Sequence, residues 1–69
     1  MRLRAAESAR KARAMPGTYV LFGRYPQSLA NRVVARVKAG GYPAFADGMW
    51  DATRRQDEVW VMYLGSRLP

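Results

Sequence analysis

Apolar side chains recur along residues 26–39 at the spacing of an α-helix. The stripe follows the i, i+3, i+4, i+7 pattern and is widened by one leucine: Ala30, Val33, Val34, Val37 and Leu29. Pro26 suits the first turn of such a helix, and Gly40 suits a left-handed residue after its end. Because valine is a mediocre helix former, we expect this helix to depend on packing its stripe against a sheet.

Residues 18–25 and 58–64 predict strands that are apolar on both faces. Both segments are rich in β-branched and aromatic residues, and neither alternates with polar residues as a strand with one solvated face does. Residues 42–53 also indicate an extended segment with a turn or bulge near Asp47-Gly48, and residues 54–57 a polar connection. Residues 17–69 therefore predict an α+β domain: a small three-stranded sheet with one packed amphipathic helix, in the order β-α-β-β.

Residues 1–16 predict a basic N-terminal helix or arm. Their Ala, Arg, Lys, Glu and Leu content favours helix, but the cations are spread around its axis and leave only Leu3 and Ala6 to dock. An isolated helix of this length is marginal in water. The segment is thus either a frayed arm or a helix that a partner orders, and we expect the sheet to fold without it.

One helix covers one face of the sheet and leaves the other face to be covered. Three alternatives could cover that face: the N-terminal segment, a nucleic acid stacked on aromatic side chains, or a second copy of the chain. Leucine and methionine suit a protein interface better than a base-stacking platform. A homodimer is therefore favoured, with four expected interface residues: Tyr19, Leu21, Trp60 and Met62.

Composition adds a strong positive charge to this picture. Twelve Lys and Arg against five Asp and Glu leave a formal net charge of +7, which favours nucleic acid first and acidic protein surfaces second as partners. Arginine also serves simply to keep a small protein in solution. The basic residues beside predicted elements form the expected nucleic-acid-binding set: Arg24, Arg32, Arg36, Lys38, Arg54 and Arg55.

Candidate chemistry is sparse. The chain has no cysteine and no histidine, which excludes disulfides, thiolate metal sites and the commonest zinc ligand. Asp47 and Asp51 could approach one another as a carboxylate pair, but solvation of a turn and a strand edge explains them more simply. We expect no catalytic residue, metal or cofactor. No apolar run reaches the length of a membrane span or a secretory signal, so we expect a cytoplasmic protein with no membrane partner.

Short aromatic motifs carry a resemblance to known proteins. GTYVLFGRY, a helix ending in Gly-Gly-Tyr, then MWDATRR and VWVMYLG resemble small accessory proteins of the mycobacteriophage type, encoded by tailed phages of actinobacteria. The resemblance spans about residues 17–65. It implies a phage accessory protein in the cytoplasm of the host cell, and it implies no particular biochemical function.

A partial similarity links YVLFGRY and ANRVVARVKAGGYPAF to the first strand, helix and second strand of a SPOR domain, which binds peptidoglycan. The second helix and fourth strand of that domain have no counterpart here, and neither does an export signal. The similarity therefore indicates a fold rather than cell-wall binding.

Two functions follow as expectations. The first is a non-enzymatic accessory protein that binds nucleic acid through an arginine-rich surface. The alternative is a protein-interaction module that binds and perturbs a host protein, with an exposed Trp50 or Tyr63 contacting that partner.

Overall fold

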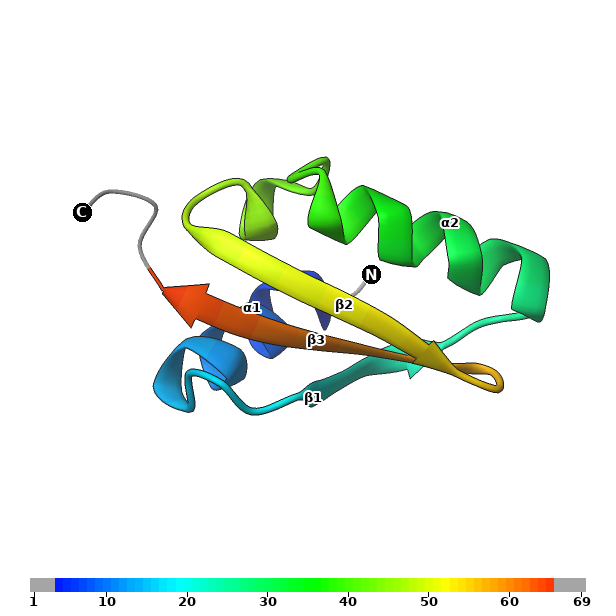
Figure 1. Ribbon diagram of the computed structural model, residues 1–69, viewed down its shortest axis with the longest axis horizontal. Helices are drawn as coiled ribbons and strands as arrows, with labels where there is room; N and C mark the ends of the chain where they lie inside the picture. Colours follow the sequence, from blue (N-terminus) through cyan, green and yellow to red (C-terminus); the bar gives the residue numbers. More distant parts are fainter. Residues whose placement is uncertain (1–3, 66–69) are drawn as a thin grey trace.

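The computed structural model describes residues 4–65 and shows two helices packed on a three-stranded antiparallel sheet (Figure 1). The α+β fold predicted from the apolar pattern is therefore confirmed. In chain order the elements are α1 (Arg4–Ala14), β1 (Val20–Arg24), α2 (Gln27–Lys38), the 3-10 helix η1 (Pro43–Phe45), β2 (Met49–Arg55) and β3 (Glu58–Gly65).

The most apolar strand lies at the centre of the sheet. The strand order is β1-β3-β2, and β3 pairs antiparallel with both neighbours. Arg55 lies opposite Glu58, so β2 and β3 form a hairpin whose turn is Gln56-Asp57. The predicted polar connection over residues 54–57 is thus too long at its start, because Arg54 and Arg55 belong to β2. In β1, Phe22 is an extra residue between the Leu21–Trp60 and Gly23–Val59 pairs, which is the geometry of a β-bulge.

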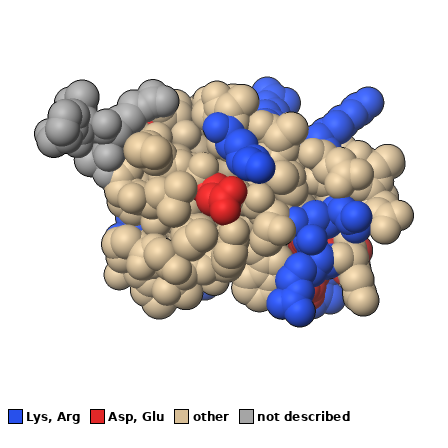
Figure 2. All heavy atoms as spheres, viewed as in Figure 1, with Lys and Arg blue, Asp and Glu red and all other residues tan. Residues whose placement is uncertain are grey.

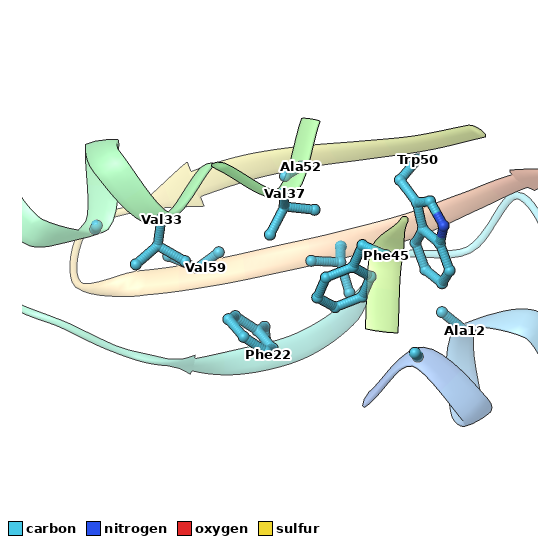
Figure 3. Packing of buried hydrophobic residues seen from close by; sticks show 11 residues of the cluster. Ala12, Phe22, Val33, Val37, Phe45, Trp50, Ala52 and Val59 are labelled. Atoms are coloured by element: carbon cyan, nitrogen blue, oxygen red, sulfur yellow. The ribbon is translucent and has the colours of Figure 1, made fainter. Parts of the chain in front are cut away.

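Both helices cover the same face of the sheet. Alternation along β3 directs Val59 and Val61 to one side, where each is fully buried. The same cluster contains residues from α1, α2, η1 and all three strands, as Figure 3 shows. Its buried members are Ala9, Ala12, Phe22, Ala30, Val33, Val37, Phe45, Trp50, Ala52, Val59 and Val61. The predicted stripe of α2 accordingly packs on the sheet through Ala30, Val33 and Val37, and Gly40 beyond its end has φ +72°, as predicted.

The N-terminal helix is part of this core, which corrects the expectation of a loosely attached segment. Ala9 and Ala12 are only 1% and 0% exposed, and Ser8 is buried beside them. The predicted docking strip was wrong: Ala6 is exposed, and Leu3 lies outside the described residues. Small side chains let α1 lie close to β1 and β3, so the helix buries its small residues rather than a leucine stripe.

Residues 42–53 are less extended than their pattern predicted. η1 carries the fully buried Phe45 into the core, and β2 starts only at Met49, after a turn at Gly48 with φ +86°. Trp50 then packs edge-on against Phe45 with 4.7 Å between ring centroids. Trp50 is only 8% exposed, so it belongs to the core and the expectation of an exposed partner-binding Trp50 was wrong.

Candidate interaction surfaces

The face of the sheet opposite the helices is uncovered by any described element, and we call it the open sheet face. Strand alternation and register place on it the side chains that point away from Val59 and Val61. They are Tyr19, Leu21, Arg24, Met49, Asp51, Thr53, Arg55, Glu58, Trp60, Met62 and Leu64. The four residues predicted as an interface, Tyr19, Leu21, Trp60 and Met62, are therefore brought together on one surface.

The open sheet face is unusually apolar for a solvent-exposed surface. Four of its large side chains have 37–50% of their surface exposed: Tyr19, Leu21, Met49 and Leu64. Trp60 and Met62 between them are half-buried. In Figure 2, where the strands lie in front of α1, the surface over the strands is mostly uncharged and basic side chains gather near the β2–β3 turn. Large apolar patches on a protein surface commonly mark interaction sites.

A hydrogen bond crosses this face from one edge strand to the other. The Tyr19 hydroxyl donates to Asp51 Oδ2 over 2.6 Å, reaching from one edge of the sheet across Met62 of β3 to the other edge. This hydrogen bond, with smaller contributions from burial and from the negative charge of Asp51, raises the pKa of Tyr19 above its ordinary value of 10.0. A shallow hollow of about 290 Å³ lies beside it, lined by Tyr19, Thr53, Arg55 and Trp60.

An ion pair lies at the hairpin end of the face. Arg24 contacts Glu58 across the β1–β3 pair at 2.9 Å, and the indole of Trp60 donates to the same carboxylate at 3.3 Å. These contacts occupy Glu58. Asp51 and Arg55, in contrast, make no ion pair within residues 4–65.

The other side of the protein is basic. Exposed cations of the two helices form what we call the basic helical side: Arg10, Lys11, Arg13, Arg32, Arg36 and Lys38. The two helices carry one acidic residue, Glu7, and α2 carries none. The guanidinium of Arg36 lies over the ring of Tyr42 at 4.9 Å, which holds one of these cations in place.

The predicted nucleic-acid-binding residues divide between the two sides. Arg32, Arg36 and Lys38 lie on the basic helical side, whereas Arg24 and Arg55 lie on the open sheet face. Arg54 is a neighbour of α2, because its Nε donates to Asn31 Oδ1 at 3.0 Å. Its NH1 also donates to the Gln56 carbonyl at 2.8 Å. The six residues therefore form two groups rather than one stripe.

Three contributions were missed in the sequence. Met49 and Leu64 extend the open sheet face, and their alternation with Trp50 and Tyr63 was a usable signal. In the sequence Arg13 is one of several cations of the N-terminal segment, but its guanidinium lies over the rings of Trp50 and Tyr63 at 5.4 and 5.7 Å and joins α1 to β2 and β3. No spacing rule in the sequence indicates that contact, because it depends on how the strands are ordered.

The two aspartates considered as a pair have separate surroundings. Asp51 accepts the Tyr19 hydrogen bond, while the main-chain carbonyl of Asp47 accepts one from the Trp50 indole at 2.9 Å. Over residues 4–65, no three carboxylates group in a way that could hold a metal ion. None of the described helices is long and apolar enough to cross a membrane.

Comparisons with known proteins add no functional information, so a function has to be inferred from these surfaces. No protein family, curated protein or solved structure matches this chain.

Proposed function

We propose that this protein is a non-enzymatic, phage-type accessory protein that binds nucleic acid through its basic helical side. The observation that carries the proposal is the separation of charge from apolar surface. All three cations of α2 are exposed and no carboxylate accompanies them on that helix. The ion pair found within residues 4–65 joins Arg24 and Glu58, on the open sheet face, so the helical cations are not neutralised by ion pairs.

Phosphate groups are the natural partners of such a surface. Each phosphate that a Lys or Arg neutralises releases condensed counterions, and this release drives binding without any base contact. Arg32 and Arg36 are four residues apart on α2, so they share one flank of the helix. The stacking of Arg36 on Tyr42 restricts its side chain before binding, which reduces the entropy lost on contact with a phosphate.

The salt dependence of binding to a fluorescently labelled DNA duplex tests this proposal. With roughly four phosphate contacts, log affinity is expected to fall against log salt with a slope near −3.6, and loss of one contact flattens the slope by about 0.9. Arg32→Ala and Arg36→Ala are each expected to show that flattening. Arg24→Ala is the matched control, because Arg24 lies on the opposite side of the sheet and is expected to leave the slope unchanged.

Two results would contradict the proposal. Absence of a complex even at low salt removes nucleic-acid binding altogether. If Arg24→Ala flattens the slope as much as Arg32→Ala does, the nucleic acid does not bind specifically to the helical side.

A second function is supported by the exposed apolar side chains of the open sheet face. In that case the protein is an interaction module that binds a host protein there. A host protein retained after nuclease treatment by the unaltered chain and by Arg32→Ala, but lost by Leu21→Glu, would favour this alternative. Leu21 is suited to the test because it is 37% exposed, whereas a change at the buried Trp50 would disturb the core.

A further inference from the structure

The open sheet face carries one acidic and one basic side chain that lack ion-pair partners within residues 4–65. They are Asp51 and Arg55, which lie on the same face of β2 because they are an even number of residues apart. Their Cα atoms are four steps apart along the strand, roughly 13 Å, too far for the two side chains to pair with each other in one chain. Thr53 lies halfway between them and is paired with Trp60 of β3.

We propose that the open sheet face binds a second copy of this chain through a two-fold axis level with Thr53. The axis lies between the two sheets and runs perpendicular to the strands. Each β2 then crosses over the β2 of the partner in the opposite direction. Asp51 faces Arg55 of the partner subunit, and by symmetry Arg55 faces Asp51 of the partner subunit.

The level of the axis follows from charge and from register. An axis level with Asp51 would set two carboxylates against each other, and an axis level with Arg55 would set two guanidinium groups together. Trp60 of β3 and Leu21 of β1 lie in the same row across the sheet as Thr53. The centre of the interface is then uncharged and self-paired, with the reciprocal charge pairs on either side of it.

The apolar side chains of the face favour a second copy as its cover. Burial of Tyr19, Leu21, Trp60 and Met62 also enlarges the core of a chain that is small for independent stability. This proposal does not rest on nucleic-acid binding.

Charge exchange at the two β2 positions tests the pairing. The unaltered chain is expected to be a dimer at micromolar concentration by analytical ultracentrifugation. Asp51→Arg alone opposes two arginines, and Arg55→Asp alone opposes two aspartates, so each is expected to weaken self-association at least tenfold. An equimolar mixture of the two variants restores both pairs and is expected to form a heterodimer, as is expected of the Asp51→Arg/Arg55→Asp chain with itself.

The control is Arg32→Asp, which makes the same charge change on α2 and is expected to leave the dimer intact. Circular dichroism establishes that each variant is folded. A monomeric unaltered chain at 100 micromolar overturns the proposal, and so does a mixture of the two single variants that stays monomeric. Dimeric single variants overturn it as well, since the charged pairs then do not face each other.

A crosslinking experiment gives an answer even where a charge variant fails to fold. The chain has no cysteine, so Thr53→Cys introduces a unique thiol at the axis. Packed sheets lie about 10 Å apart, beyond the reach of a disulfide but within that of a short bismaleimide. We expect crosslinked dimer from Thr53→Cys and none from Ala35→Cys, which places the thiol on the exposed side of α2. Equal crosslinking of the two variants overturns the proposal.

Discussion

The hydrogen bond from Tyr19 to Asp51 makes stability depend on pH in the alkaline range. The pKa of Tyr19 in the folded chain is raised above the unfolded value of 10.0, so the folded state holds the proton more tightly. The stabilisation is fully present below pH 10 and is lost as pH rises through the higher folded-state pKa. Urea unfolding from pH 8 to 11 is expected to show a stability advantage of the unaltered chain over Tyr19→Phe that shrinks at the top of this range. An advantage that stays constant with pH contradicts the assignment.

A glycine is required at position 17 for its backbone conformation alone, and at position 48 for its backbone conformation and for lack of space. Gly17 and Gly48 have positive φ, +81° and +86°, which costs an L-residue about 1–2 kcal/mol. A Cβ at Gly17 would meet nothing within 4 Å, whereas one at Gly48 would lie 2.7 Å from a ring carbon of Tyr63 and 3.0 Å from the Gly65 carbonyl oxygen. Gly17→Ala is therefore expected to lower the free energy of unfolding by about 1–2 kcal/mol and Gly48→Ala by roughly 2–5 kcal/mol. Equal losses in chemical denaturation would show that the contact with Tyr63 relaxes.

The helix α1 docks through small residues, which makes it sensitive to added volume on one side only. Ala12 is fully buried against the sheet, whereas Ala6 on the same helix is exposed. Ala12→Leu is expected to lower the free energy of unfolding by about 1–3 kcal/mol, because the extra methylenes have no space in the core. Ala6→Leu adds the same side chain to the same helix and is expected to change stability by less than about 0.5 kcal/mol. A destabilising Ala6→Leu together with a neutral Ala12→Leu would mean that α1 docks through the opposite face.

The same helix shows why some elements are easier to predict than others. In α2, valines at helical spacing identify both the helix and its buried side, and Gly40 marks its end. In α1, the buried positions hold alanine and serine, whose side chains are too small to stand out from the exposed alanines around them. The aromatic residues within 42–48 also suit a strand, so their pattern predicts an extended segment, but Phe45 reaches the core from a short 3-10 helix.

The open sheet face was largely predictable, and the basic set was not. Alternation along Glu58–Leu64 was enough to put Trp60 and Met62 on one side, and a strand over Thr18–Tyr25 did the same for Tyr19 and Leu21. Arg54 and Arg55 were assigned together to a connection. As consecutive residues of β2 they point to opposite faces, one to Asn31 of α2 and the other to the open sheet face. The sequence did not reveal that β2 extends to Arg55, and only that extent shows that the two arginines lie on opposite faces.

The face-to-face dimer and the basic helical sides together predict that one dimer holds two duplexes. When two sheets pack through their open faces, the helices of the two subunits lie on opposite outer surfaces of the dimer. A dimer is therefore expected to carry a labelled duplex onto DNA-coated beads, because each outer surface binds one duplex. The Asp51→Arg chain is expected to keep binding a single duplex in solution but to lose at least tenfold in bead capture.

The Asp51→Arg/Arg55→Asp chain is the matched control for that loss. It has the net charge of the unaltered chain and both reciprocal pairs, so its bead capture is expected to return to the unaltered level. Capture that persists in a monomeric Asp51→Arg chain would place two phosphate-binding surfaces on one subunit. Capture that is absent from a stable dimer would mean that the two basic helical sides do not face apart, because two separated sites on one particle otherwise bridge two duplexes by mass action.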